Sequence, residues 1–399
     1  MSSEKELTTI PVAPLKLIVM ESCAALGKKV DDYIVQFRND AHNEHKESIE
    51  FNGYLEDSYI INSKCPRFGS GEAKGQILDS VRGTDLYILT DVCNHSITYN
   101  VFGHTNYMSP DNHFQDLKRI IAAAGSHCKR ITVIMPFLYE SRQHKRSKLE
   151  SLDAALALQE LTKMGVSNII TFDAHDPRVN NSIPLRGFDN FQPPYQFIKA
   201  ITKKFKDITI DKEHLMIISP DEGAMSRAVY FSSVLGVELG MFYKRRDYAH
   251  VVNGKNPIVA HEFLGSDVTG KDVMVIDDMI SSGESILDTA ANLKQRGCRR
   301  VFVCTTFGLF TDGMAKFDEY YNKGYISGVV TTNLTYISDN IKANFIEADM
   351  SKFLAKIIDA LNHDKSIGGL MDPTERIHEL IDNYNEETKL EYEKELAEK

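Results

Sequence analysis

The sequence predicts an α/β protein built on parallel sheets with helices on both faces. Short apolar runs recur along the whole chain, and stretches with a helical spacing of apolar residues separate them. Regular alternation of strand and helix is typical of parallel sheets, because each return to the same edge needs a crossover helix. The predicted strands are residues 15–20, 86–92, 131–138, 168–172, 215–219, 273–277, 301–306 and 328–332.

The helical stretches between these strands have recognisable ends. Residues 152–164 and 285–296 carry helical spacing, and each is followed by a glycine of the kind that closes helices, Gly165 and Gly297. Residues 39–50 (NDAHNEHKESIE) are polar throughout, which indicates a solvated loop insertion.

The chain of 399 residues is long enough for two domains of ordinary size. Adjacent prolines in DNFQPPY, residues 189–195, precede a new helical pattern and indicate a boundary. We therefore predict a doubly wound α/β domain over residues 1–191 and a second over residues 192–372. Residues 373–399 form a predicted acidic helical tail, which either packs on its own domain or contacts another subunit. One face of this tail carries Ile377, Leu380, Ile381 and Tyr384.

Composition restricts the class of protein. Hydrophobic residues make up 42% and charged residues 26%, as in soluble globular proteins. No apolar run approaches the roughly 20 residues of a membrane helix, and we see no secretory signal. Six scattered cysteines without a CxxC pair indicate reduced thiols and a cytoplasmic location. The net charge of −10 argues against a general nucleic-acid binder, so an anionic ligand needs a local basic site.

Four polar clusters directly follow predicted strands. They are DAHD (173–176), PDEG (220–223), YKRR (243–246) after a strand near 239–242, and the pair Asp277 and Asp278. Because ligands of open parallel sheets bind beyond the carboxyl ends of strands, these clusters indicate a ligand site.

The most informative segment is VMVIDDMISSGES, residues 273–285. A buried strand ends in Asp277 and Asp278, a turn of small residues follows, and a helix begins near Ser285. Such a loop offers backbone N–H groups, hydroxyls and a helix N-terminus to a phosphate. The two carboxylates suit sugar hydroxyls or a hydrated Mg²⁺. The alternative interpretation is an ordinary turn with an acidic tip.

Motifs in both halves of the chain resemble those of the phosphoribosyl-pyrophosphate (PRPP) synthetase family. FGSGE (68–72) and VRGTDLYIL (81–89) come first, followed by PFLYESRQHKR (136–146) and FDAH (172–175). SPDEGAMSRA (219–228), YKRR and the loop described above complete the set, which spans about residues 68–371. The resemblance to a divergent member of this family implies two domains of the phosphoribosyltransferase-like type.

The resemblance also implies a reaction, in which ATP transfers its diphosphoryl group to C1 of ribose 5-phosphate, giving AMP and PRPP for nucleotide biosynthesis. By position, Lys244 and Arg246 are the implied catalytic residues, and His175 and Asp221 the implied Mg²⁺ ligands. The residues implied to bind ATP are Phe68, Ser70, Gly71, Glu72, Arg142 and Gln143. Those implied to bind ribose 5-phosphate are Arg246, Asp277, Asp278, Ser281, Ser282, Gly283, Glu284 and Ser285. The family also implies a homo-oligomer, a hexamer, with part of the ATP set contributed by a neighbouring subunit.

The chain departs from the family's pattern at the sites themselves. Ser70 replaces an aspartate, His144 and Lys145 follow Arg142-Gln143 where the family has Asp-Arg, and Ser281 and Glu284 alter the sugar-phosphate loop. A glutamate beside a phosphate repels it unless a cation neutralises the charge.

Two other functions and several ordinary interpretations therefore stay open. A non-catalytic homologue that regulates an active subunit is compatible with the altered loop. A phosphoribosyltransferase that consumes PRPP explains the loop but leaves the 68–72 motif unused. Taken singly, His175 is a structural histidine, Phe68 a core residue, and Arg142 and the run 244–246 solvated surface.

Overall fold

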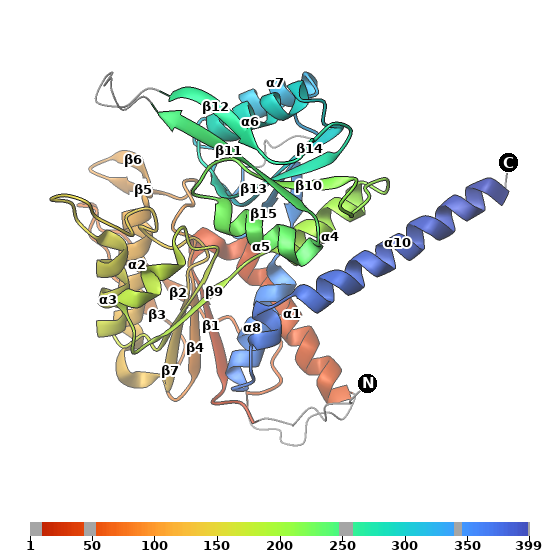
Figure 1. The fold of residues 1–399 in the computed structure, drawn as a ribbon. Helices are drawn as coiled ribbons and strands as arrows, with labels where there is room; N and C mark the ends of the chain where they lie inside the picture. The colour runs from red at the N-terminus through yellow and green to blue at the C-terminus, as the bar shows by residue number, and fades with distance from the viewer. Residues whose placement is uncertain (1–9, 44–52, 247–257, 339–344, 398–399) are drawn as a thin grey trace. The chain divides into compact units, whose positions relative to one another are not determined.

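The computed structural model describes residues 10–43, 53–246, 258–338 and 345–397 (Figure 1). The chain divides into two compact units. The first unit consists of Met1–Gln192, Asn333–Tyr336 and Asp349–Met371, and the second of Pro193–Thr332, Ile337–Ala348 and Asp372–Lys399. Within the described residues, no helix combines the length and the apolar content needed to cross a bilayer.

The first unit is built on a five-stranded sheet in which all neighbouring strands are parallel. Its spatial order is β1 (Leu15–Val19), β4 (Asp85–Leu89), β7 (Arg130–Ile134), β8 (Asn168–Phe172) and β9 (Gly187–Phe191). Two small antiparallel hairpins are added, β2–β3 (Ser63–Lys64, Gln76–Ile77) and β5–β6 (Thr98–Val101, His104–Tyr107).

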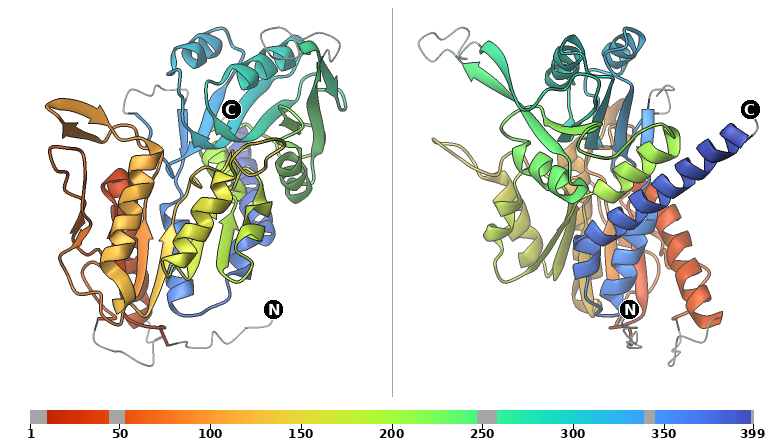
Figure 2. Two further views of the ribbon diagram at one scale, coloured as in Figure 1. Left: turned by 90° about the vertical axis from the view of Figure 1, so that its left-hand side faces the viewer. Right: turned by 45° about the vertical axis from the view of Figure 1, so that its right-hand side comes forward.

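Helices cover both faces of this sheet (Figures 1 and 2). On one face lie α2 (Pro110–Ala124) and α3 (Asp153–Lys163), and on the other α1 (Ala24–Asn43) and α8 (Ser351–Asn362). The short α9 (Gly368–Met371) and the 3-10 turns Glu21–Cys23, Gly125–His127 and Pro177–Ser182 complete the unit. The start of α2 follows from its sequence, because the Ser109 side chain accepts from the backbone N–H of Asn112, and Pro110 has no N–H that would need an acceptor.

Helix α1 corrects the predicted loop at residues 39–50, because it continues to Asn43; residues 44–50 lie outside the described part. The reason is tertiary. The Arg38 side chain is buried, its Nε lies 3.1 Å from Asp359 Oδ1 of α8, and its guanidinium stacks on Tyr54 and Tyr59 at 4.7 Å. These contacts hold the last helical turns in place despite their polar sequence.

The structure differs from the predicted division of the chain at residues 349–371. This segment was predicted in the C-terminal domain, but it packs in the first unit through α8. Besides the pairing of Arg38 with Asp359, the amide of Asn362 donates to Ala13 O at 3.0 Å and to Asp85 Oδ2 at 2.9 Å. A late segment of the chain therefore closes one face of the first sheet.

The second unit is built on a seven-stranded sheet, parallel except for an antiparallel hairpin at one edge. Its spatial order is β12 (Ile258–Leu264), β11 (Glu238–Arg246), β10 (Leu215–Ser219), β13 (Asp272–Ile280), β14 (Arg300–Gly308), β15 (Gly328–Thr332) and β16 (Phe345–Ala348). One face carries α4 (Pro194–Lys204), α5 (Met225–Leu235) and α10 (Thr374–Ala397), the other α6 (Glu284–Gln295) and α7 (Ala315–Asn322). Both units confirm the predicted doubly wound α/β class.

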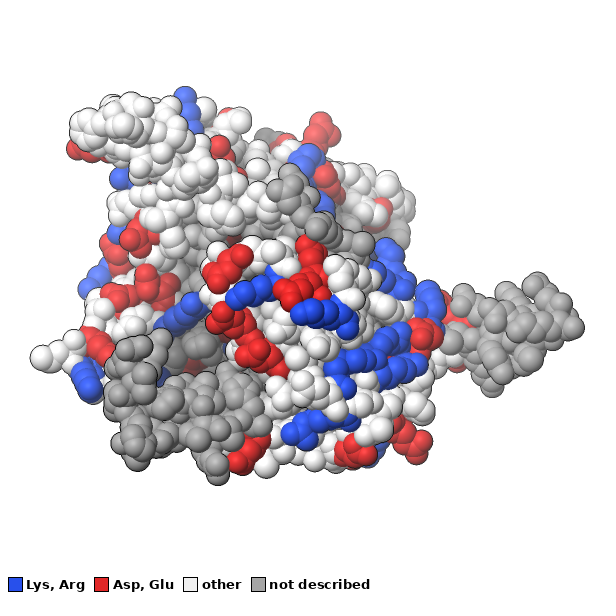
Figure 3. All heavy atoms as spheres, turned by 90° about the horizontal axis from the view of Figure 1, so that it is seen from above, with Lys and Arg blue, Asp and Glu red and all other residues white. Residues whose placement is uncertain are grey.

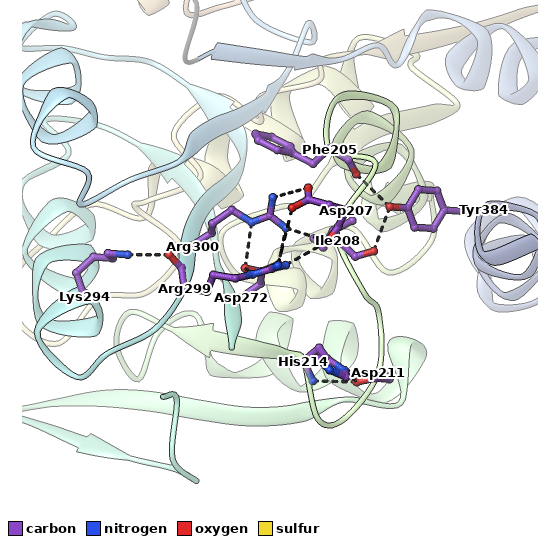
Figure 4. A network of polar contacts seen from close by, with 10 residues as sticks. All are labelled: Phe205, Asp207, Ile208, Asp211, His214, Asp272, Lys294, Arg299, Arg300 and Tyr384. Carbon is purple, nitrogen blue, oxygen red and sulfur yellow. Dashed lines mark hydrogen bonds and ion pairs between the residues drawn. The ribbon is translucent and has the colours of Figure 1, made fainter. Parts of the chain in front are cut away.

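The tail helix α10 packs on its own unit, the first of the two predicted alternatives. Ile377 and Tyr384 are buried in the core that α4 and α5 share, with Leu380 and Ile381 partly buried beside them. The Tyr384 hydroxyl lies 3.1 Å from the carbonyl oxygens of both Phe205 and Ile208 (Figure 4). The predicted apolar face is therefore an internal packing surface.

Buried charge fixes the amino end of the central strand β13. Asp272 is fully buried and accepts hydrogen bonds from the guanidinium groups of Arg299 and Arg300, which also reach Asp207 (Figure 4). Burial alone raises the pKa of Asp272, but the two guanidinium groups outweigh it and lower the pKa below its usual value. The strand that carries the predicted sugar-phosphate loop is thus anchored at its far end.

Candidate functional site

The FGSGE segment of the first unit forms a tight loop closed by its own backbone. Phe68 N donates to Glu72 O at 2.7 Å, and the Ser70 hydroxyl donates to Glu72 Oε2 at 2.9 Å. Gly71 has φ +90°, and a Cβ there would lie 2.9 Å from Val101 Cγ2 of the β5–β6 hairpin, so the position requires glycine. Phe68 is 53% exposed, which excludes its interpretation as a core residue.

Arg142 and Gln143 lie in the connection that follows β7. Arg142 is exposed, whereas Gln143 is half-buried and its side-chain amide donates to Ser151 O at 2.7 Å. The preceding Glu140 has φ +58°, an uncommon backbone conformation for a residue with a side chain. Burial is the main reason that the pKa of Glu140 is raised, and Asp153 adds to the effect.

His175 follows β8, the neighbour of β7 in the sheet, and the structure brings it close to His144. The two imidazole ring centres lie 5.3 Å apart with a tilt of 57°. His144 Nε2 is 3.4 Å from Asp176 Oδ2, and the Nδ1 atom of His144 is buried without a hydrogen-bond partner. Hydrogen bonds from Arg178 lower the pKa of Asp176 well below its usual range, so this carboxylate is ionised at neutral pH.

Asp221 follows β10 in the second unit and organises the turn into α5. Its Oδ1 accepts from the backbone N–H groups of Gly223 at 3.0 Å and Ala224 at 3.3 Å, while the Ser219 hydroxyl donates to its carbonyl oxygen at 2.7 Å. This carboxylate is half-buried and suits a cation whose remaining ligands are water and substrate oxygens. Among the residues that the structure describes, no group of three or more His, Cys, Asp or Glu is arranged to hold a metal ion by itself.

Asp277 and Asp278 lie within β13, which corrects their predicted place at the strand tip. The strand continues to Ile280 because β14 also continues, with Asp277 opposite Thr305 and Ile280 opposite Gly308. Successive side chains of a strand point to opposite faces, so the two carboxylates enter different surroundings. Burial, together with the charge of Asp278, raises the pKa of Asp277 well above its usual value. Asp278 is itself buried, with its Oδ2 3.7 Å from a guanidinium nitrogen of Arg227.

The turn Ser281-Ser282-Gly283 leads directly into α6. Gly283 has φ +84° and precedes the first helical residue, and an added Cβ would lie 2.4 Å from Cζ of Phe317. The buried Phe317 ring of α7 therefore packs against the turn, and this close contact requires glycine at position 283. A turn that leads into a helix N-terminus offers backbone N–H groups of the kind that bind a phosphate.

Glu284, the first residue of α6, is paired with a cation that the sequence did not reveal. Its Oε1 lies 2.8 Å from Lys316 Nζ of α7, and both side chains are about half exposed. The ammonium group of Lys316 lowers the pKa of Glu284, which is ionised at neutral pH. The expected repulsion of a phosphate by Glu284 is therefore offset within the unit.

The run 243–246 lies inside β11 and not after it, which corrects a second predicted strand end. The strand is longer because β12 pairs with it antiparallel, with Lys244 opposite His261. The side chains of Lys244 and Arg246 lie outside the described residues, and their implied roles stay predictions. On the face shown in Figure 3, acidic and basic side chains both occur and lie close to one another.

Comparison with known proteins identifies the family. The family model described as the N-terminal domain of ribose phosphate pyrophosphokinase matches residues 15–165, and the phosphoribosyl transferase domain matches residues 189–332. A protein of Haemophilus ducreyi named ribose-phosphate pyrophosphokinase is 28% identical over 316 residues, covering 78% of this chain and 91% of its own length. The chain belongs to the ribose-phosphate pyrophosphokinase family.

Further members match comparable or longer stretches of the chain. A ribose-phosphate pyrophosphokinase of Chlorobaculum tepidum is 25% identical over 373 residues, 93% of this chain and 99% of the relative. One of Chromobacterium violaceum is 29% identical over 311 residues, 77% and 86% of the two chains. The phosphoribosylpyrophosphate synthetase of Mycobacterium smegmatis matches the fold with a TM-score of 0.66 at 22% identity, over 88% of this chain and 99% of that one.

Three residues beside the predicted site belong to its surroundings in this pyrophosphokinase-family chain. His144 stands beside His175, Arg227 faces Asp278, and Lys316 binds Glu284. His144 and Arg227 lie within the sequence motifs 136–146 and 219–228, but the motifs by themselves imply no role for either residue. No local sequence pattern indicates Lys316 as a partner of Glu284, because the two residues are 32 positions apart in the chain.

Proposed function

We propose that the chain transfers the β,γ-diphosphoryl group of ATP to the C1 hydroxyl of ribose 5-phosphate, giving PRPP and AMP. The observation that carries the proposal is the β13–α6 loop, in which carboxylates, a glycine-dependent turn and a helix N-terminus follow one another in a chain of this family. A phosphoribosyltransferase is a poorer fit, because residues 15–165 match the N-terminal domain of the pyrophosphokinases.

In this proposal the second unit binds ribose 5-phosphate. Asp277 and Asp278 accept hydrogen bonds from sugar hydroxyls, and Arg227 holds Asp278 in place. The 5-phosphate binds the hydroxyls and backbone N–H groups of Ser281, Ser282, Gly283, Glu284 and Ser285. Lys316 keeps the loop from carrying a net negative charge.

The first unit binds ATP through two segments. The exposed Phe68 ring offers a surface on which adenine stacks, and the loop holds Ser70, Gly71 and Glu72 beside it. The other segment supplies Arg142 and Gln143, a cation and an amide for the polyphosphate.

Charge neutralisation completes the reaction. His175 and Asp221 would hold Mg²⁺, which would supply Lewis-acid stabilisation of charge on the phosphate oxygens. Lys244 and Arg246 donate to the diphosphoryl oxygens, and Arg246 also serves the sugar phosphate. Diphosphoryl transfer needs positioning and charge stabilisation more than covalent catalysis, so cations and fixed donors suffice.

The assay uses the purified full chain with ATP, Mg²⁺ and ribose 5-phosphate, and measures AMP, ADP and PRPP. We expect AMP and PRPP in equal amounts, formed only when the sugar phosphate is present. The variant Asp277→Asn tests the loop and is expected to lose most turnover. ADP as the product contradicts the proposal, whereas a folded protein without turnover supports the non-catalytic homologue that regulates an active subunit.

The proposal includes an assembly and a location. We propose a homo-oligomer, a hexamer by family resemblance, that works in the cytoplasm. Light scattering coupled to size exclusion gives its mass directly, and a monomeric active enzyme contradicts this part of the proposal.

A further inference from the structure

The proposed function uses His175 as a metal ligand but gives no role to His144, which lies beside it in the first unit. His144 comes from the connection after β7 and His175 from the connection after the neighbouring strand β8. Their ring centres are 5.3 Å apart. A nitrogen–metal bond of about 2.1 Å places the centre of a ligating imidazole about 3.2 Å from the ion, so two rings on one ion lie about 4.5–5.5 Å apart. The observed separation falls in this range.

The second observation is an orphaned nitrogen. His144 Nδ1 is buried and accepts no hydrogen bond, and a buried polar atom without a partner is costly. The other ring nitrogen, Nε2, faces Asp176 Oδ2 at 3.4 Å. A carboxylate on one side of an imidazole favours the proton on that nitrogen and leaves the lone pair on the other, as in carboxylate–histidine–metal triads.

We propose that His144 is a second imidazole ligand of the divalent ion that His175 holds, and that this site binds Mn²⁺, Co²⁺ and Ni²⁺ more tightly than Mg²⁺. The physical reason is the donor set. Mg²⁺ takes oxygen ligands almost exclusively, whereas first-row transition ions gain from imidazole nitrogen. In the proposed function Asp221 is a further ligand of this ion, and substrate oxygens and water supply the remaining positions. Among the described residues, no group of three or more His, Cys, Asp or Glu is arranged to hold a metal ion by itself.

The inference deepens the proposed function and rests on it for the assignment of a metal to His175. It adds a ligand, a tautomer and an order of metal affinities. Asp176 is a positioning residue in it, held by Arg178 on its outer side.

The deciding measurement needs no variant. Mn²⁺ is added to the untagged full-length chain, and pulsed electron paramagnetic resonance records the ¹⁴N couplings of its ligands. We expect the couplings of two imidazole nitrogens. One coupling, or none, overturns the proposal.

Calorimetric titration with Ni²⁺ and Mg²⁺ then tests the residue. His144→Gln keeps an amide for Asp176 but removes the Nδ1 lone pair, so Ni²⁺ affinity should fall at least about tenfold while Mg²⁺ affinity changes less. The matched control is His214→Gln, since His214 Nδ1 also pairs with an aspartate, Asp211, at 2.8 Å. Equal losses in both variants, or none in His144→Gln, contradict the proposal.

These measurements are separate from turnover. A wild-type chain that makes no PRPP but shows two nitrogen couplings contradicts the proposed function and leaves the metal site standing. A chain that makes PRPP but shows a single nitrogen coupling supports the proposed function and contradicts the metal site. If His144→Gln fails to fold, the wild-type spectrum alone decides.

Discussion

At the scale of single residues, Glu284 shows how a neighbour changes the meaning of a charge. In the sequence it is a carboxylate placed where a phosphate is expected to bind, and two like charges at such a position repel each other. In the structure Lys316 Nζ lies 2.8 Å from it. Lys316 supplies the cation that the sequence analysis named as the condition for a phosphate beside Glu284.

We predict that Lys316→Met raises the KM for ribose 5-phosphate about five- to tenfold, because the freed carboxylate then repels the phosphate. In the Glu284→Gln background the same substitution should change KM less than about twofold. A steady-state double-mutant cycle at saturating ATP measures this coupling.

The matched control is Lys323→Met, which breaks a second ion pair of α7, with Glu319, at similar exposure. A loss that is equally large in the Glu284→Gln background shows instead that Lys316 acts on the phosphate directly. An unchanged KM in Lys316→Met means that the Glu284–Lys316 pair does not affect binding of ribose 5-phosphate.

For Lys244 we predict that substitution by alanine lowers kcat about 10²-fold or more, with a smaller change in KM. A cation that stabilises charge developing in the transition state acts mainly on kcat. Rapid-quench measurement of AMP gives the rate of the chemical step, and Lys199→Ala, on the exposed surface of α4, is the control. A near-normal kcat supports the alternative interpretation, in which Lys244 is a solvated surface residue.

At the scale of elements, the strands that the sequence predicted to the residue are β8, β10 and β15. Each is an apolar run buried on both faces, so the run and the strand coincide. Strands β11 and β13 run further than predicted. Strand β11 extends along β12, which the sequence did not predict, and β13 extends along β14, which itself continues past its predicted end at residue 306. Strand β9, with the sequence GFDNF, was missed since its polar residues do not form an apolar run.

The candidate site was predictable in part for a related reason. Its loop residues form local motifs of strand end, turn and helix start, which sequence patterns capture. Contacts between distant segments are not local, and the pairs Glu284–Lys316 and Arg227–Asp278 are of that kind. The continuation of α1 past Arg38 likewise depends on Asp359, 321 residues away.

Helix α10 gives a prediction at this scale, because its stability contribution comes from one buried face. Ile377→Ala removes a fully buried side chain from the core shared with α4 and α5, and should lower the free energy of unfolding by about 2–4 kcal/mol. Chemical denaturation followed by circular dichroism measures it. Glu379→Ala, exposed on the same helix, should change stability by less than about 0.5 kcal/mol. Equal effects mean that α10 is not part of the core.

At the scale of the whole molecule, the order of the chain does not follow the division into units. The first unit takes most of its residues from Met1–Gln192 but closes with Asp349–Met371. Within it, α8 covers the sheet beside α1, where Leu26, Val30 and Ile34 are buried. Polar contacts add to this packing, because Asn362 Nδ2 donates to Ala13 O and Asp85 Oδ2. The first unit is therefore complete only after nearly the whole chain has been made.

We predict that a fragment of residues 1–192 does not fold cooperatively, because it leaves an apolar sheet face and the fully buried Arg38 without their α8 partners. Joining residues 349–371 to this fragment through a flexible glycine–serine linker should restore a single thermal transition and near-ultraviolet circular dichroism.

In the joined fragment, Asn362→Ala should lower the transition temperature by several degrees, since it leaves Asp85 and a backbone carbonyl with one donor fewer. The linker with residues 349–371 in scrambled order is the control for mere solubility. If residues 1–192 alone melt cooperatively at the same temperature as the joined fragment, α8 is an accessory to a unit that is already stable, and the predicted contiguous N-terminal domain describes this chain after all.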